Sequence, residues 1–392
     1  MDERLQPDWF PTSQPVLDNQ IAAYDDMRQR CPVAHSDYLN WSLFSHADVK
    51  RVLDDHETFG NAFSAHLSIP NGMDPPEHTA YRQIIDRYFT HGRMTTFEPV
   101  CRQIAAELVE QLPASGEVEL MESFARVFSL RMQCAFLGWP EDLHEPLRRW
   151  IDKNHRATPA RDRVAMAAVA LEFDHFIKEL LVARREAGTA APDDITTSLL
   201  RDQIGDRTLG ARTLDDEEIV SILRNWTVGE LSTIAASVGI LAHYLATHPG
   251  VQRQLRERPS SLPIAIDEIL RIHGPLIASR RITTKAVEIG GRHVSAGERI
   301  SLIWASANRD EAVSGDPDEF RLDREPSDNL LYGAGIHDCP GAPLARLELL
   351  AVMEELLKCT DHIELVPGKD PVMAAYPASG FSTLPLRISR NV

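Results

Sequence analysis

The stretch from Leu331 to Glu348, LYGAGIHDCPGAPLARLE, constrains this 392-residue chain more than any other. Cys339 lies there between glycine-rich turns, directly before a segment with helical periodicity. The free N–H groups and the positive dipole end at a helix N-terminus both favour thiolate over thiol. Gly333, Gly335 and Gly341 allow the backbone to turn with positive φ and to lie flat against a broad group. The stretch therefore predicts a thiolate that can bind a soft metal.

Two other interpretations of Cys339 exist. A lone cysteine is often an ordinary buried side chain, but the glycines and the histidine at fixed offsets argue against that reading here. A zinc site containing His337 and Cys339 would need further ligands. The chain has no C-x-x-C pair and no second cluster of histidine and cysteine to supply them.

The pattern Y-G-x-G-x-H-x-C-x-G, which ends at Gly341, resembles the cysteine-ligand loop of cytochromes P450. The resemblance implies that Cys339 is the axial ligand of haem iron and that His337 reaches a haem propionate. One departure is Tyr332, because the family usually has phenylalanine there. The resemblance also implies a mainly α fold, a helical prism with small β-sheets that holds haem b, and a single haem domain over residues 1–392.

Composition limits the remaining possibilities. The hydrophobic fraction of 43% is ample for a core, and no linker rich in Gly, Ser or Pro divides the chain. No apolar run approaches the roughly 18 residues of a membrane span, and the N-terminus lacks a signal-peptide pattern, so we expect a cytoplasmic protein and no membrane partner. Five widely spaced cysteines fit reduced thiols, and a formal charge of −17 argues against nucleic acid as a partner.

Residues 74–90, DPPEHTAYRQIIDRYFT, predict a helix on which His78 and Arg82 lie one turn apart on the same face. A solvated helix face is one interpretation of that pair. The segment also resembles the P450 helix whose H-x-x-x-R pattern binds a haem propionate. The preceding loop, residues 60–73, matches the family's substrate-covering loop, which implies substrate contacts at Phe63, Leu67 and Ile69 unless these side chains only anchor the loop.

Residues 215–247 predict a long buried helix with an acidic start. Its apolar middle contains Glu230, Ser232 and Thr233, and a carboxylate there is costly unless it is paired or functional. The segment resembles the P450 helix over the oxygen-binding face of the haem, with the pattern A/G-G-x-D/E-T. Counting back from Pro249 places the oxygen-side threonine at Thr233 and Gly229 at the first position, so that Val228 and Gly229 border the substrate.

In this register Ser232 occupies the position of the family's acid, which is a departure. We expect Glu230, three residues before Thr233, to supply the displaced carboxylate and to help deliver protons. A buried carboxylate satisfied by backbone or arginine is the other interpretation of Glu230. A rival register assigns the alcohol to Ser232 and leaves Leu231 at the acid position, but it requires a gap before Pro249.

Glu268 and Arg271 match the family's E-x-x-R, and Arg324 follows where the family completes a three-residue ionic cluster. Arg281 matches an arginine that binds a haem propionate, with Arg280 as the alternative. The remaining substrate contacts implied by the resemblance are apolar, namely Leu276, Ile277, Ala278 and Phe381.

The resemblance implies a monooxygenase that uses O₂ to oxidise a C–H bond of a small hydrophobic substrate. The reaction would be hydroxylation or O- or S-dealkylation, for example of an aromatic or alkyl ether. Electrons would come from a separate ferredoxin and an NAD(P)H-dependent ferredoxin reductase. The alternatives are a peroxygenase that uses H₂O₂ and a non-catalytic haem-thiolate binding or sensor protein.

Overall fold

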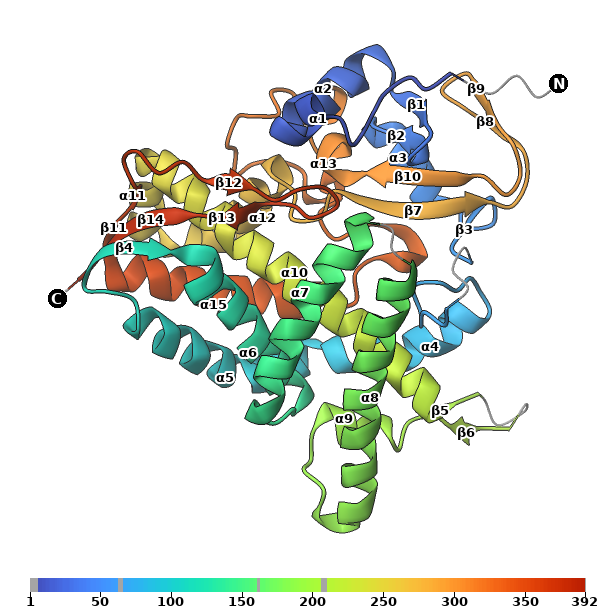
Figure 1. The fold of residues 1–392 in the computed structure, drawn as a ribbon. Coiled ribbons are helices and arrows are strands. Elements are labelled where there is room, and N and C mark those ends of the chain that lie inside the picture. The colour runs from blue at the N-terminus through green and yellow to red at the C-terminus, as the bar shows by residue number, and fades with distance from the viewer. Residues whose placement is uncertain (1–5, 63–65, 161–162, 206–209, 392) are drawn as a thin grey trace. The chain divides into compact units, whose positions relative to one another are not determined.

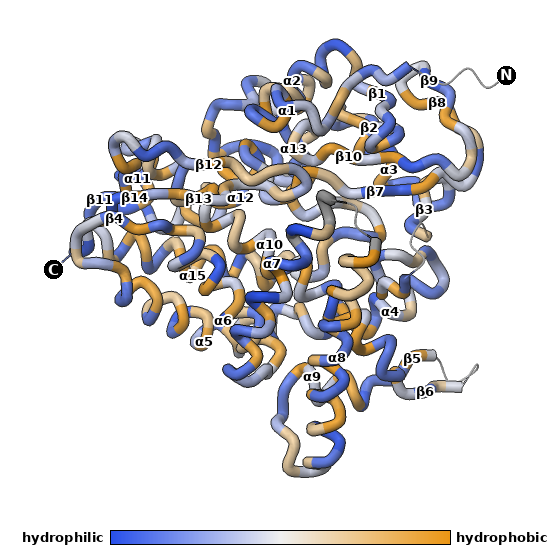
Figure 2. The backbone as a smooth tube through the Cα atoms, viewed as in Figure 1, coloured by the Kyte–Doolittle hydropathy of each residue, from blue (hydrophilic) through white to orange (hydrophobic). Residues whose placement is uncertain are grey.

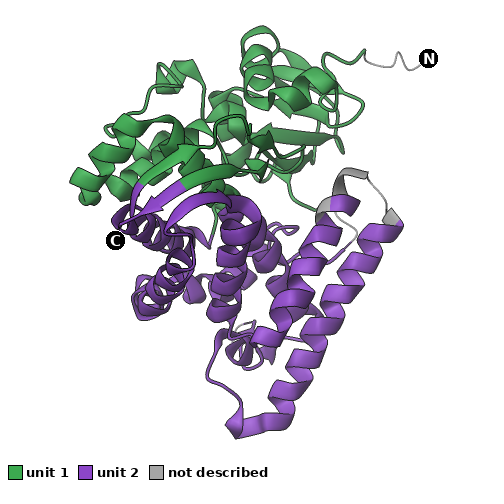
Figure 3. Ribbon diagram, turned by 60° about the vertical axis from the view of Figure 1, so that its left-hand side comes forward, with its two compact units in different colours: residues 1–63, 236–339, 362–387 green, residues 64–235, 340–361, 388–392 purple. Residues whose placement is uncertain are grey.

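The computed structural model describes residues 6–62, 66–160, 163–205 and 210–391. It divides into two compact units, each assembled from segments that are far apart in the sequence (Figure 3). Unit 1 comprises residues 1–63, 236–339 and 362–387, and unit 2 comprises residues 64–235, 340–361 and 388–392. Three elements contain residues of both units: α10 (Asp216–Thr247), β11 (Thr360–Leu365) and β14 (Pro385–Arg390).

Unit 1 is built on a five-stranded sheet with the order β1-β2-β10-β7-β3 (Figure 1). Its strands are β1 (Val33–Ser36), β2 (Asn40–Leu43), β3 (Phe59–Gly60), β7 (Ala278–Thr283) and β10 (Arg299–Ile303). The β2–β10 pair is parallel and the other pairs are antiparallel. Two hairpins also belong to this unit: β8 (Val287–Ile289) with β9 (Arg292–Val294), and β12 (Val372–Met373) with β13 (Phe381–Thr383).

The helices of unit 1 are mostly short. They are α1 (Gln14–Asp18), α2 (Gln20–Arg30), α3 (His46–Asp54), α11 (Pro249–Glu257), α12 (Leu262–Ile272), α13 (Trp304–Ala307) and α14 (Glu311–Ser314), with 3₁₀ turns η5 (Pro259–Ser261), η6 (Pro326–Asp328) and η7 (Gly335–His337). Two apolar clusters form the core of this unit: Trp41, Leu43 and Ile300 belong to one, and Phe44 and Ile277 to the other.

Unit 2 is helical. Its helices are α4 (Glu77–Ile85), α5 (His91–Glu110), α6 (Arg126–Leu137), α7 (His144–Ala160), α8 (Arg163–Ala187), α9 (Ile195–Leu199) and α15 (Ala342–Cys359). Shorter elements are η1 (Asp86–Phe89), the π-helical turn η2 (Met121–Ala125), η3 (Glu141–Leu143), η4 (Gly188–Ala190), β4 (Ser115–Glu119) and the hairpin β5 (Gln203–Ile204) with β6 (Arg212–Thr213). Helix α5 packs against α15, and hydrophobic and hydrophilic residues alternate along α5 (Figure 2).

Most predicted elements are present. The predicted helix over residues 215–247 is α10, and the Gly290-Gly291 pair turns between β8 and β9 with φ of +53° and +74°. Helix α5 begins at His91 and continues through Pro99. Among the described residues, α10 alone is long and apolar enough to cross a membrane by length and composition, and 67% of its apolar 18-residue window is buried in the protein.

Candidate functional site

The loop before Cys339 is fixed by its own backbone. The Cys339 N–H donates to the Tyr332 carbonyl at 2.8 Å, and Gly333 and Gly335 have φ of +78° and +72°, as predicted. A Cβ at Gly335 would lie 2.2 Å from the carbonyl oxygen of Leu53, so no side chain fits there. The loop is therefore held as a tight turn within unit 1.

The prediction of positive φ at Gly341 is wrong. Gly341 has φ −79° and ψ 0°, because it is the N-cap from which α15 continues directly in the right-handed helical region. Gly333 and Gly335 therefore form the turns of the loop, and Gly341 is the N-cap residue of α15.

Cys339 differs from the other cysteines in its surroundings. Its side chain is exposed, whereas Cys101 and Cys134 are buried. Burial raises the pKa of the Cys134 thiol to about 12, and burial together with the nearby Glu230 raises that of Cys101 to about 12. Burial also raises the pKa values of the Cys31 and Cys359 thiols. These four side chains are poor sources of thiolate.

Strand β7 separates the two arginines that the sequence left as alternatives. Successive side chains of a strand point to opposite faces. Arg281 is 7% exposed and donates to the Arg280 carbonyl at 2.8 Å, whereas the Arg280 side chain is exposed. Of the two, Arg281 points into unit 1, which also contains the half-buried His337.

In unit 2, His78 and Arg82 lie on α4 as the sequence predicts. The His78 side chain is buried, so the pair is not simply a solvated helix face. Arg82 is only partly exposed, and its Nε donates to Asp86 Oδ1 at 2.7 Å. Histidine and arginine in this arrangement can donate to a carboxylate such as a propionate.

Glu268, Arg271 and Arg324 meet in a buried ionic cluster in unit 1. Glu268 accepts from Arg271 Nε at 2.8 Å on one oxygen and from Arg324 Nε at 2.8 Å on the other. Arg271 also donates to the carbonyls of Asn308 and Pro317. Each charge is therefore paired, and the cluster fixes the segment that leads to the cysteine loop.

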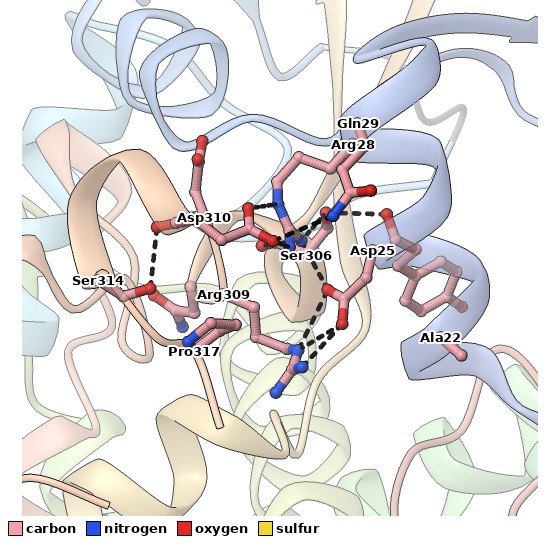
Figure 4. A network of polar contacts seen from close by, with 12 residues as sticks. Ala22, Asp25, Arg28, Gln29, Ser306, Arg309, Asp310, Ser314 and Pro317 are labelled. Atoms are coloured by element: carbon pink, nitrogen blue, oxygen red, sulfur yellow. Dashed lines mark hydrogen bonds and ion pairs between the residues drawn. The ribbon is translucent and has the colours of Figure 1, made fainter. Parts of the chain in front are cut away.

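A second polar network joins α2 to the segment around α13 and α14 (Figure 4). Asp25 accepts from Arg28 and from Arg309, each at 2.7 Å, and Arg28 also donates to Glu311. Ser306 Oγ accepts from Arg28 at 3.0 Å. The two arginines are almost fully buried, so this network holds residues 304–314 against α2 by paired charges.

The loop before α4 is tied to α10. Ser221 Oγ accepts from the Ile69 N–H at 2.9 Å and donates to the Leu67 carbonyl at 3.0 Å, and Asn225 Nδ2 donates to the Ile69 carbonyl at 2.7 Å. Ile69 is fully buried in the core of unit 2, and Leu67 is exposed. These hydrogen bonds anchor the loop at Ile69, and the substrate contacts at Leu67 and Ile69 stay predictions. The predicted contact at Phe63 lies outside the described residues.

The middle of α10 contains the predicted oxygen-side residues. Val228 and Gly229 are exposed, Ser232 and Thr233 are half-buried, and Thr233 Oγ1 donates to the Gly229 carbonyl at 2.6 Å. Glu230 neighbours Glu348 on α15, and burial raises the pKa of both carboxyl groups.

Glu348 is a buried acidic residue for which the sequence motifs predict no function. A signal was present, because Glu348 shares the helical spacing of the apolar Leu344 and Val352, which are buried.

The other predicted substrate contacts differ in exposure. Leu276 is exposed and Ala278 is half-buried, whereas Ile277 is buried in the core of unit 1 with Ile303. Phe381 packs on the ring of His243 at a centroid distance of 4.5 Å. Leu276 is thus the accessible apolar side chain of this segment, and the predicted contact at Ile277 falls on a buried one.

The residues present fit a haem group. Unit 1 offers an exposed thiol at Cys339 together with His337 and Arg281 as donors. A thiolate suits the iron, and cationic donors suit the propionates.

Comparison with known proteins identifies the family. The family model "Cytochrome P450" matches residues 261–390. The mycinamicin IV hydroxylase/epoxidase of Micromonospora griseorubida is 32% identical, over 75% of this chain and 72% of its own length. The vitamin D(3) 25-hydroxylase of Pseudonocardia autotrophica is also 32% identical, over 77% of this chain and 72% of its own.

A solved structure agrees with these matches. CYP109E1 from Bacillus megaterium in complex with testosterone superimposes with a TM-score of 0.83 at 26% identity, over 95% of this chain and 100% of that one. The predicted fold class, mainly α with small sheets, is confirmed. The chain therefore belongs to the bacterial cytochromes P450, the haem-dependent monooxygenases that act on hydrophobic substrates with O₂.

Proposed function

We propose that residues 1–392 form a single haem b domain in which Cys339 is the axial ligand. The observation that carries this assignment is the exposed thiol of Cys339 on a turn fixed by its own backbone hydrogen bond, while the other four thiols have raised pKa values. When bound, the haem supplies the activation of O₂. The protein supplies binding, orientation and protons.

His337 and Arg281 in unit 1, and His78 and Arg82 in unit 2, are proposed to bind the haem propionates. Burial of Arg281 and His78 inside the protein supports the assignment, because arginine and histidine side chains can donate hydrogen bonds to a carboxylate. Gly341 lies in the same motif and begins α15. Glu268, Arg271 and Arg324 have a structural role and do not contact the reacting groups.

On α10, Thr233 is proposed as the alcohol that positions protons on the oxygen side, with Glu230 as their acidic source. Glu230 precedes Thr233 by three residues, which puts both side chains on one helix face. Ser232 remains the alternative alcohol.

The substrate is proposed to be a small hydrophobic molecule, hydroxylated or O- or S-dealkylated, such as an aromatic or alkyl ether. The exposed apolar side chains of Leu67, Val228 and Leu276 support an apolar binding surface in each unit, to which Gly229, Ala278 and the buried Phe381 are proposed to contribute. Ile69 and Ile277, whose side chains are buried, are proposed to contact the substrate from the inside of their units.

Electrons are proposed to come from a ferredoxin and its NAD(P)H-dependent reductase in the cytoplasm. The chain contains neither a G-x-G-x-x-G motif nor a set of cysteines that could bind an iron–sulfur cluster.

The test is the difference spectrum of the haem-reconstituted, dithionite-reduced protein with CO. We expect the Soret position of a thiolate-ligated ferrous–CO haem in the wild type, and its loss in Cys339→Ser. Cys31→Ser, at a half-buried cysteine in unit 1, is the matched control and should keep it. A histidine-type spectrum in the wild type would refute the ligand assignment.

Measurements of substrate oxidation distinguish the monooxygenase from the two alternative functions. Oxidation of methoxybenzene with NADPH, ferredoxin and reductase supports the monooxygenase. Turnover with H₂O₂ alone would instead indicate the peroxygenase, and CO binding without oxidation under either condition would indicate a binding or sensor protein.

A further inference from the structure

The hairpin of β12 and β13 in unit 1 rests on one face of α10. A Cβ added at Gly380, where φ is +75°, would lie 3.4 Å from both the Cβ and the carbonyl oxygen of Ala236. The next residue, Phe381, packs its ring on that of the half-buried His243 at a centroid distance of 4.5 Å. Ala236 and His243 are seven residues apart, so they lie two turns apart on the same face of the helix. A backbone contact and a ring contact therefore seat this part of the hairpin on α10.

Two hydrogen bonds attach the same hairpin to other parts of unit 1. Ser379 Oγ donates to the Gly274 carbonyl, and Gln20 Nε2 of α2 donates to the Ala374 carbonyl at 2.9 Å. The strands themselves contain no titratable side chain, because β12 is Val-Met and β13 is Phe-Ser-Thr. Among these attachments, the ring contact of His243 is therefore the one made by a group that titrates near neutral pH.

Two further histidines lie beside His243. His248, which follows α10, stacks on the Tyr244 ring at a centroid distance of 3.9 Å, and His273, which follows α12, lies 5.8 Å from the same ring. Burial lowers the pKa of His243, and His248 lowers it further. Burial, with Arg309 and His243 nearby, lowers the pKa of His273 to about 4. A positive charge on His243 is therefore opposed both by burial and by its cationic neighbours.

The acidic side chains near these histidines are already paired. Asp318 accepts from Arg309 Nη1 at 2.8 Å, and Glu268 is bound by the two arginines of its own ionic cluster. Because both carboxylates already balance arginine charges, they do not compensate a further positive charge on His243. The neutral imidazole is therefore the form that packs on Phe381.

We propose that His243 is a positioning residue, whose neutral imidazole holds the Phe381 ring in place and whose protonation releases that ring and weakens substrate binding. The inference rests on the proposed function, in which Phe381 contributes to an apolar binding surface. An imidazolium requires hydration, so the protonated ring leaves the apolar contact for water. The hairpin then loses one of its attachments to α10, and a hydrophobic substrate binds less tightly in acid than near neutral pH.

The first test needs neither substrate nor turnover. Amide hydrogen exchange of residues 372–383 in the haem-loaded protein is measured at about pH 7.5 and about pH 5, with correction for the intrinsic pH dependence of exchange. We expect the corrected protection of the wild type to fall about 2- to 10-fold in acid, the range that an aromatic contact contributes. His243→Phe keeps a ring that cannot be protonated and should show no fall.

His293→Phe, at an exposed histidine of β9 in the same unit, is the matched control and should behave as the wild type does. No loss of protection in the wild type, or an equal loss in His243→Phe, would overturn the proposal.

The second test measures the dissociation constant of methoxybenzene from the shift of the haem absorption band on binding. We expect the wild-type constant to rise about 2- to 10-fold between neutral and acidic pH, as the ring contact is lost. His243→Ala, which lacks the ring, should have the raised constant at both pH values, and His243→Phe should have the low constant at both. The proposal also fails if exchange depends on pH while the dissociation constant does not.

The two tests keep this inference separate from the proposed function. If the wild type lacks a thiolate-type CO spectrum, or has that spectrum but does not bind methoxybenzene, the proposed ligand or substrate class fails. The exchange measurement then still decides whether His243 holds the hairpin. If spectrum and binding are both present without the pH dependence, only the role of His243 fails.

Discussion

Arg271 Nε lies 2.8 Å from Glu268 Oε2 one helical turn away on α12, and both side chains are only 4% exposed. Glu268→Gln leaves the positive charges of Arg271 and Arg324 without a buried partner. We expect the free energy of unfolding to fall by about 3–5 kcal/mol, measured by urea denaturation. Asp323→Asn removes the partner of Arg321 in a more exposed pair and should cost less than about 1 kcal/mol. Equal costs in the two variants would contradict this prediction.

Arg281 and Arg280 form a matched pair for haem retention. Arg281→Ala removes a buried cationic donor, and we expect haem affinity to fall by about 10- to 100-fold, the equivalent of a charged hydrogen bond. Arg280→Ala, on the exposed face of β7, should leave affinity unchanged. Haem transfer to apomyoglobin measures both. The assignment is wrong if the Arg280 variant loses haem faster.

Ser221 is expected to hold the loop before α4 in place. Ser221→Ala leaves the buried Ile69 N–H without its acceptor, which should cost about 1–3 kcal/mol. The loop should also become more sensitive to limited proteolysis near Leu67. Ser123→Ala, at an exposed serine, is the control. Identical cleavage rates in the three proteins would show that other contacts hold the loop.

Glu218, at the start of α10, should make the free energy of unfolding depend on pH in the acidic range. Burial alone would raise its pKa, but hydrogen bonds from Arg212, Tyr81 and the Asp215 N–H lower it to about 2. A lowered pKa gives stability that is full above the unfolded value near 4.5 and is lost as pH falls toward 2. Glu218→Gln should therefore be less stable than the wild type at pH 7 and approach it below pH 4. Thermal melts across this range are the measurement.

Glu348 should show the opposite dependence. Its pKa is raised by burial, then by Glu230, so the folded state binds more protons than the unfolded state above the usual value of 4.5. Wild-type stability from this group is therefore complete below pH 4.5 and declines as pH rises. Glu348→Gln removes that decline, so its melting temperature relative to the wild type should increase with pH. A pH-independent difference would indicate that Glu348 is not protonated in the folded protein.

Short sequence motifs predict the features of this protein that depend on neighbouring residues. The turn at Gly333 and Gly335 and the pairing of Glu268 with Arg271 depend on neighbours in the sequence, so their spacing was informative. Arg324 was reached only through the family resemblance, because 53 residues separate it from Arg271.

Contacts between residues that are far apart in the sequence could not be predicted from local patterns. Gly341 has the residue type of a left-handed turn, but the helix it starts fixes its conformation. The carboxyl group of Glu230 neighbours that of Glu348, which lies 118 positions later in the sequence, and no periodicity within α10 could identify this neighbour. The place of Ile69 in a loop predicts either a substrate contact or an anchor, whereas the hydrogen bonds from its backbone to Ser221 and Asn225 of α10 depend on residues more than 150 positions away.

The close approach of Gly335 to the Leu53 carbonyl ties the cysteine loop to the C-terminal end of α3, over 280 residues earlier in the chain. The conformation of the cysteine loop therefore depends on residues at the end of α3, outside the loop itself. Insertions or prolines near Leu53 should shift the position of Cys339 without altering any residue of its motif. Randomised libraries that leave residues 52–55 intact should yield more folded, haem-binding clones than libraries that vary them.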